Sequence, residues 1–157
     1  MNVYMNVAKE LADDNLKTNV GGPFGAVVVK DGKIIGRGSN HVLANNDPTA
    51  HAEVTAIRDA CKTINSYDLS GCILYTSCYP CPMCLSAIIW ANIKEVYYGN
   101  TKEDADKIGF RDDYIYDFIN HIDDKDYNKI LDLKQLDRDE TIKTFNDFAN
   151  KEDKTIY

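Results

Sequence analysis

The stretch Pro80-Cys81-Pro82-Met83-Cys84, together with His51-Ala52-Glu53 earlier in the chain, is the most informative part of this sequence. One histidine and two cysteines supply three protein ligands for zinc, and a site with three protein ligands leaves the fourth tetrahedral position open to water. That coordination is typical of a zinc ion that takes part in chemistry. Glu53 adds a carboxylate that can take a proton from water and pass it on. We therefore predict a catalytic zinc site with His51, Cys81 and Cys84 as ligands and Glu53 as the base.

Cys78 leaves a second interpretation open. The segment Cys78-Tyr79-Pro80-Cys81 is a further CxxC pair, and three cysteines with His51 would make a closed, structural zinc site. A structural site has no use for Glu53, however, and a chain of 157 residues can build a core without a metal. These two points favour the catalytic interpretation.

The apolar pattern around these fragments places both groups of ligands at helix starts. Residues 49–63 have helical spacing, with His51 and Glu53 in the first turn, and residues 82–90 form an apolar helix that begins with Pro82. A helix N-terminus offers partial positive charge and unpaired N–H groups, which favour the thiolate form that a metal needs. The predicted secondary structure therefore agrees with the predicted metal site.

The remaining elements predict an α/β fold. Residues 24–29 and 33–38 flank Asp31-Gly32, a dipeptide typical of a tight hairpin turn. Because helices and strands alternate along the chain, we expect a sheet with helices on both faces and residues 127–133 as its fifth strand. The other expected elements are helices at 3–16 and 140–149 and strands at 72–76 and 95–99.

The composition excludes several classes of protein. The chain has the length of one domain, and its five cysteines are an odd number, of which the metal site claims two, so a disulfide framework is not expected. No apolar run reaches the roughly 18 residues of a membrane span, and residues 1–17 lack the pattern of an export signal. We expect a cytoplasmic protein with no membrane partner.

The charge distribution argues against a nucleic-acid partner. The net charge is −7, and residues 100–157 hold sixteen acidic and ten basic residues. A protein that binds a polyanion needs clustered lysines and arginines, and the four arginines of this chain belong to no basic run. We therefore expect no nucleic-acid partner, and we interpret the acidic half as a solvated surface.

Five segments of the sequence resemble the bacterial guanine deaminases, which belong to the cytidine deaminase superfamily. The resemblance runs over nearly the whole chain. The zinc motif alone is shared by cytosine, cytidine and tRNA adenosine deaminases, so it identifies the superfamily, whereas the flanking segments indicate the substrate. The five segments are residues 21–26, 45–54, 74–78, 80–84 and 109–110.

The resemblance implies a three-layer α/β/α fold with a five-stranded mixed sheet, formed by one deaminase domain over residues 1–157. It also implies hydrolysis of guanine to xanthine and ammonia, with one Zn²⁺ per subunit and a purine base as the small-molecule partner. The alternatives are a tRNA adenosine deaminase, another nucleobase or nucleoside deaminase of the superfamily, and a non-catalytic zinc-binding protein. The acidic second half argues against a tRNA substrate, and Glu53 argues against a non-catalytic protein.

The resemblance also assigns residues to the substrate. It implies that Phe24 lines the base pocket, that Asn40 bonds the base, and that Ala52 contacts the substrate as well. Asp112 is expected to assist proton transfer. From the residues alone, Phe24 could be strand core, Asn40 could simply end its strand, and a slip of one residue would exchange Asp112 for Asp113.

The last residues, Thr155-Ile156-Tyr157, carry a further expectation. From the residues alone, a solvated tail is the default for a chain end. The family ends in a tyrosine that reaches an active site, on a segment exchanged between two subunits. The resemblance therefore implies a homodimer with exchanged C-terminal segments and Tyr157 at a substrate pocket. Tyr79 is a departure, because the family has a glutamate at this position.

Overall fold

The computed structural model describes residues 1–110, 112–127 and 130–157 of the chain. These residues form two compact units, Met1–Tyr116 and Asp117–Tyr157. The first unit contains the sheet and most of the helices. Its elements are α1 (Val3–Asn15), β1 (Gly25–Lys30), β2 (Lys33–Ser39), α2 (Val42–Asn45), α3 (Ala52–Ile64), β3 (Ile73–Cys78), α4 (Pro82–Trp90), β4 (Glu95–Asn100) and α5 (Lys102–Lys107), followed by the first turn of α6 (Asp113–Asn120).

The sheet is mixed and has four strands in the order β2-β1-β3-β4. β1 pairs antiparallel with β2 and with β3, whereas β3 and β4 are parallel and are connected through α4. Asp31 and Gly32 join β1 to β2 and both have positive φ, 49° and 75°. Two successive positive φ values are what a tight hairpin turn of this kind requires, so the predicted Asp-Gly hairpin is confirmed.

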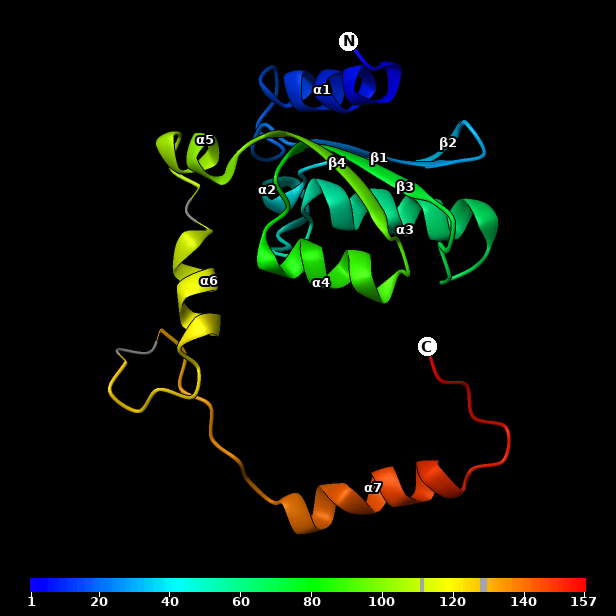
Figure 1. Ribbon diagram of the computed structural model, residues 1–157, viewed down its shortest axis with the longest axis vertical. Coiled ribbons are helices and arrows are strands. Elements are labelled where there is room, and N and C mark those ends of the chain that lie inside the picture. Colours follow the sequence, from blue (N-terminus) through cyan, green and yellow to red (C-terminus); the bar gives the residue numbers. More distant parts are fainter. Residues whose placement is uncertain (111, 128–129) are drawn as a thin grey trace. The chain divides into compact units, whose positions relative to one another are not determined.

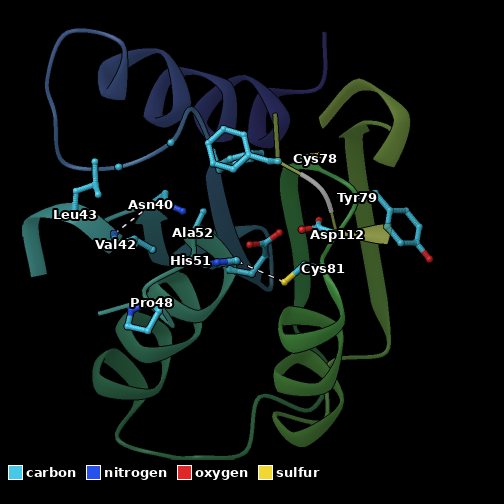
Figure 2. Close-up of a pocket in the computed structure, with 15 residues that line it drawn as sticks. Asn40, Val42, Leu43, Pro48, His51, Ala52, Cys78, Tyr79, Cys81 and Asp112 are labelled. Carbon is cyan, nitrogen blue, oxygen red and sulfur yellow. Dashed lines mark hydrogen bonds between the residues drawn. The ribbon is translucent and has the colours of Figure 1, made fainter. Parts of the chain in front are cut away.

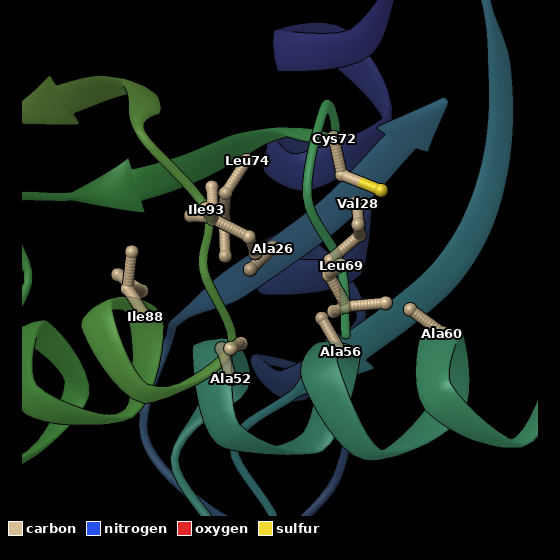
Figure 3. Close-up of a cluster of buried hydrophobic side chains, with 11 residues drawn as sticks. Ala26, Val28, Ala52, Ala56, Ala60, Leu69, Cys72, Leu74, Ile88 and Ile93 are labelled. Atoms are coloured by element: carbon tan, nitrogen blue, oxygen red, sulfur yellow. The ribbon is translucent and has the colours of Figure 1, made fainter. Parts of the chain in front are cut away.

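Alternate residues of β1 supply the two cores of the first unit, which has three layers (Figure 1). Val27 and Val29 point toward α1 and pack with its residues Tyr4, Val7 and Leu11. Ala26 and Val28 point to the opposite face, where α3 and α4 cover the sheet. The buried cluster on that face is drawn in Figure 3 and includes Ala52, Ala56, Ala60, Leu74, Ile88 and Ile93. The predicted α/β/α layers are confirmed.

Two glycines of β2 allow α3 to lie directly against the sheet backbone. A Cβ atom on Gly38 would lie 2.3 Å from the carbonyl oxygen of Ala52, and one on Gly36 would lie 2.4 Å from that of Ala56. Both distances are well inside van der Waals contact, so no larger residue fits at either position. This close approach fixes the N-terminus of α3, and with it His51 and Glu53, beside the end of β2.

The start of α3 differs from the prediction. The helix begins at Ala52, and His51 is its N-cap residue rather than part of its first turn. Asp47 accounts for the difference, because its carboxylate accepts hydrogen bonds from the backbone N–H and the hydroxyl of Thr49. This local turn competes with helix formation and holds residues 47–50 outside the helix. The helix at residues 82–90 is confirmed with its predicted bounds.

The predicted fifth strand is wrong. Tyr127 and residues 130–133 form no strand, and residues 128–129 lie outside the described residues. The apolar side chains of this run, Ile130, Leu131 and Leu133, are all more than half exposed. A strand needs a partner with free N–H and C=O groups, and among the described residues this run has none. The short run of apolar residues therefore did not by itself indicate a strand.

The second unit contains the end of α6 and the last helix, α7 (Arg138–Asn150). The prediction of a helix at 140–149 is confirmed, with two more residues at its start and one at its end. Across the described ranges, no helix has both the length and the apolar character needed to cross a bilayer.

Candidate active site and metal centre

The structure brings the three predicted zinc ligands together at two helix N-termini. His51 caps α3, Cys81 caps α4, and Cys84 lies in the first turn of α4. Their ligand atoms all lie within 4.8 Å of one another. The Nδ1 atom of His51 is 3.5 Å from the Sγ atom of Cys81 and 3.7 Å from that of Cys84. One imidazole nitrogen and two sulfurs are a donor set suited to zinc.

Interactions among the three ligand residues shift the pKa values of their side chains. The pKa of Cys81 is lowered to about 4, because its sulfur accepts hydrogen bonds from Cys84, whose backbone N–H is a donor at 3.5 Å, and from His51. The pKa of Cys84 is raised, because its sulfur lies beside that of Cys81 and is buried. The bond to Cys81 likewise raises the pKa of His51. Cys81 is therefore a thiolate already, and a metal ion displaces the protons that remain on the cluster.

Glu53 is buried beside the ligands. Its Oε1 atom accepts a hydrogen bond of 2.9 Å from the Thr76 hydroxyl, and its Oε2 atom accepts one of 3.3 Å from the Cys84 thiol. Burial is the main cause that raises the pKa of the Glu53 carboxyl above its ordinary value. A raised pKa makes this carboxylate a stronger proton acceptor than an ordinary glutamate, as a general base requires.

Cys78 lies outside the ligand cluster. Its thiol points to the carbonyl oxygen of Thr101, 3.6 Å away. Burial raises its pKa to about 11, so this thiol is protonated near neutral pH. Among the described residues, the cluster therefore has three ligands and not four. The closed Cys₃His arrangement is not formed.

A pocket of about 280 Å³ opens in front of these residues (Figure 2). The predicted site residues Phe24, Asn40, Ala52 and Asp112 all line it, together with His51, Glu53 and Cys81. Of the predicted site residues in the first unit, only Cys84 does not line the pocket, because it is fully buried in the ligand cluster. The remaining lining residues are Gly21, Gly22, Val42, Leu43, Pro48, Cys78, Tyr79 and Phe110.

Asn40 is held in one orientation at the pocket wall. Its Oδ1 atom accepts a hydrogen bond of 3.1 Å from the backbone N–H of Val42. The backbone passes very close on the other side, since a Cβ atom on Gly21 would lie 2.2 Å from the same Oδ1 atom. Among the described residues, no group accepts a hydrogen bond from the side-chain nitrogen of Asn40. That nitrogen is therefore available to a ligand.

Phe24 and Phe110 form an aromatic wall. Their ring centroids are 4.9 Å apart and their planes cross at 88°, which is an edge-to-face arrangement. A Cβ atom on Gly22 would lie 2.9 Å from both rings, so the glycine allows them to pack in this way. Phe24 serves this wall and also packs against the buried cluster under the sheet.

Asp112 lines the pocket, whereas Asp113 is exposed and begins α6. Burial is the main cause that raises the pKa of Asp112, followed by the charge of Cys81. The influence of Cys81 and His51 on its pKa reflects how close Asp112 lies to the metal cluster. Tyr157 lies in the second unit, and its predicted contact with a substrate pocket stays a prediction.

The sequence analysis did not identify Thr76 as a partner of Glu53. Thr76 is fully buried on β3, in which residues 74–78 are all buried. A hydroxyl in a buried strand needs a hydrogen-bond partner, and this requirement was the available signal. The aromatic contact of Phe110 with Phe24 and the apolar wall of Val42, Leu43 and Pro48 gave no comparable signal.

The family is shown by comparison with known proteins. Residues 1–100 match the family model of the cytidine and deoxycytidylate deaminase zinc-binding region. The chain therefore belongs to this family of zinc-dependent deaminases. Zinc is its cofactor, and His51, Cys81 and Cys84 are positioned to bind it.

Individual proteins and one solved structure are also similar to this chain. The chain is 48% identical to the guanine deaminase of Bacillus subtilis strain 168 over 153 residues, which are 96% of each chain. The X-ray structure of guanine deaminase from Bacillus subtilis matches with a TM-score of 0.90 and 46% identity, covering 100% of this chain and 99% of that chain. A tRNA-specific adenosine deaminase of Buchnera aphidicola subsp. Schizaphis graminum is 39% identical over 126 residues, 80% of this chain and 79% of that protein.

Proposed function

We propose that this protein is a guanine deaminase, which hydrolyses guanine to xanthine and ammonia. The observation that carries the proposal is the similarity to a guanine deaminase over 96% of the chain, combined with a three-ligand metal cluster that opens into a pocket. We also propose that the reaction gives the protein a place in purine catabolism in the cytoplasm.

The chemistry assigns a role to each charged residue. Zinc held by His51, Cys81 and Cys84 supplies Lewis acidity and a coordination position open to water. Glu53 takes the proton of the attacking water and returns it to the purine ring nitrogen or to the leaving amine. Asp112, which also lines the pocket, assists the second proton transfer. Thr76 keeps the Glu53 carboxylate in position through its hydrogen bond.

The uncharged residues of the pocket hold the purine substrate. Asn40 donates from its side-chain nitrogen to an acceptor on the purine, because its oxygen is already bonded to Val42. The backbone N–H of Ala52 is the first of α3, and such N–H groups have no partner inside the helix. It can donate to the purine carbonyl. Phe24 and Phe110 present an aromatic wall to the flat base.

The charge of the pocket supports a free base over a nucleotide or a tRNA. The described residues that line it include Glu53 and Asp112 but no lysine or arginine. Among these described residues, a phosphate would meet two carboxylates and no lysine or arginine. The tRNA adenosine deaminase alternative uses the same metal site, but it needs a positive surface around the pocket for the RNA backbone.

A panel of purines tests the proposal. Purified, zinc-loaded protein is incubated with guanine, guanosine, adenine, cytosine, ammeline and an adenosine-containing anticodon stem-loop, and ammonia release is measured. Guanine is expected to be deaminated with the highest kcat/KM. Inosine formation in the stem-loop without ammonia from guanine would instead identify a tRNA deaminase. Stoichiometric zinc with no ammonia from any compound would identify a non-catalytic protein.

Salt provides an independent check. With guanine as substrate, kcat/KM is expected to change less than about twofold between 50 and 200 mM KCl, because a neutral base releases no condensed counterions on binding. Steady-state kinetics at several salt concentrations measure this. A steep, linear fall of log kcat/KM with log salt would contradict binding of a free neutral base.

We also propose a homodimer in which the C-terminal segments are exchanged, so that Tyr157 of one chain serves the pocket of the other. Exposed apolar side chains of the second unit support this proposal, since α7 has no buried residue and exposes Phe145 and Phe148. A second copy of the chain that covered these side chains would remove them from water. Sedimentation velocity measures the expected dimer.

Deleting Ile156 and Tyr157 is expected to lower kcat/KM for guanine by about tenfold or more, because a terminal aromatic closes the pocket against water. Mixing this deletion with Glu53→Gln and refolding the mixture should restore part of the activity. In the exchanged dimer, one pocket then combines Glu53 of the truncated chain with Tyr157 of its partner. Full activity of the deletion variant would exclude a role of Tyr157 in the pocket. No recovery of activity in the mixture would exclude the exchange of C-terminal segments between subunits.

A further inference from the structure

Tyr116 connects two parts of the active-site wall that are distant in sequence. It lies at the end of the first unit, on α6, and its hydroxyl donates a hydrogen bond of 2.9 Å to the carbonyl oxygen of Pro80. Pro80 is fully buried and directly precedes the zinc ligand Cys81. We define the zinc loop as residues 78–82, from the last residue of β3 to the first residue of α4. The hydroxyl of Tyr116 therefore fastens α6 to the zinc loop.

Asp112 directly precedes α6 and is hydrogen-bonded to the first turn of that helix. The carbonyl oxygen of Asp112 accepts hydrogen bonds from the N–H groups of Ile115, at 3.0 Å, and of Tyr116, at 3.2 Å. Residues four apart in such a turn are neighbours, so the orientation of one is coupled to the orientation of the other. The anchor formed by Tyr116 thus lies one helical turn from the carboxyl that lines the pocket.

The ammonium group of Lys102 lies over the ring of Tyr116. The Nζ atom of Lys102 lies 4.8 Å from the centroid of the Tyr116 ring and 5.4 Å from that of Tyr79. Tyr79 in turn packs edge-to-face on Tyr98, with centroids 5.0 Å apart. Tyr79 belongs to the zinc loop and lines the pocket. Lys102 therefore joins α6 to the zinc loop a second time, through cation–π contacts.

We propose that Tyr116 is a positioning residue for the reaction, which holds the Asp112 carboxyl at the pocket by fastening the first turn of α6 to the carbonyl of Pro80. This role rests on the proposed guanine deamination and on the part of Asp112 in it. Tyr116 itself does not line the pocket, so it acts through Asp112. Burial raises the pKa of its hydroxyl, which keeps the group protonated and able to donate.

Positioning matters here because proton transfer depends steeply on distance. A displacement of about 1 Å of a catalytic group can cost about two orders of magnitude in rate. The three metal ligands are held at the N-termini of α3 and α4, so we expect them to stay in place without the Tyr116 hydroxyl. Loss of the hydroxyl should therefore affect turnover while zinc binding stays intact. A hydroxyl with only a structural role would affect stability instead.

Tyr116→Phe is the direct test, because it removes the hydroxyl and keeps the ring between Lys102 and the zinc loop. In the zinc-loaded full-length protein, we expect kcat for guanine to fall about tenfold, with KM changed less than about twofold and zinc still stoichiometric. Tyr114→Phe is the matched control, since Tyr114 lies on the same helix and is 52% exposed. The control should keep the wild-type kcat.

A double-mutant cycle with Asp112→Asn shows whether Tyr116 acts through Asp112. If it does, Tyr116→Phe should lower kcat by less than about twofold in the Asp112→Asn background, because the group that it positions is already lost. A full tenfold loss in that background would overturn the proposal. An unchanged kcat in Tyr116→Phe, or loss of its zinc, would overturn it as well.

Lys102→Met gives a second route to the same answer if Tyr116→Phe fails to fold. It removes the cation over the two rings, and kcat should fall about threefold with an unchanged KM. An unchanged kcat would overturn the proposal. A wild-type protein that releases no ammonia from guanine would contradict the proposed function itself, whereas an active wild type with fully active variants would contradict only the role of Tyr116.

Discussion

Glu53→Gln is expected to abolish most of the activity and leave the zinc in place. The carboxylate is not among the three ligand atoms, and glutamine has nearly the same shape, so the ion should stay bound. A lost general base typically costs about 10²–10⁴-fold in rate, and kcat for guanine should fall by at least this factor. Zinc analysis by mass spectrometry and steady-state kinetics on the same preparation measure both quantities.

A matched control separates this effect from a general loss of charge. Glu10→Gln changes an exposed carboxylate of α1 that bonds only to Asn6 among the described residues. It should keep both zinc and activity. If Glu53→Gln loses zinc in proportion to its activity, then Glu53 is a ligand and not the base.

Cys81→Ser is expected to lose zinc and activity together. Its sulfur is the one that the hydrogen bonds of the cluster hold as a thiolate, and a serine hydroxyl does not ionise near neutral pH. Two remaining ligands do not hold zinc against dilution, so dialysed protein should contain far less than one equivalent. Activity should fall below about 1% of wild type, as expected when both the Lewis acid and the activated water are lost.

Cys78→Ser is the control for the ligand assignment. Its thiol belongs to the zinc loop but points to the carbonyl of Thr101, and a serine hydroxyl can keep that hydrogen bond. Zinc should therefore stay stoichiometric in Cys78→Ser. Zinc retained in Cys81→Ser and lost in Cys78→Ser would show that the two cysteines have been assigned the wrong way round.

Part of the metal site was predictable from the sequence because two of its three ligands lie close together along the chain. Cys81 and Cys84 are three residues apart on one helical turn, and Pro82 marks where that turn begins. The hairpin at Asp31-Gly32 was equally local, since its two positive φ values are a property of the dipeptide. Such features need no knowledge of distant contacts, and the structure confirms them.

Interactions between distant segments were not predictable. The bond from Thr76 to Glu53 joins β3 to α3, and the bond from Tyr116 to Pro80 joins α6 to the zinc loop. Neither pair has a spacing that indicates contact. The prediction of a fifth strand failed for a related reason. A run of apolar residues shows that a segment favours burial, but it does not show whether the segment pairs with the edge of a sheet.

The sequence by itself determined the three candidate ligands His51, Cys81 and Cys84, the start of the helix that carries Cys84, and the tight turn at Asp31-Gly32. The tertiary structure decided the number of strands, the pocket that joins Asn40, Phe24 and Asp112 to the metal cluster, and the exclusion of Cys78 from it. The physical reason is that ligand chemistry and local geometry belong to single residues and turns. A pocket exists only where elements are packed, and here the packing depends on close approaches such as that of α3 to Gly36 and Gly38.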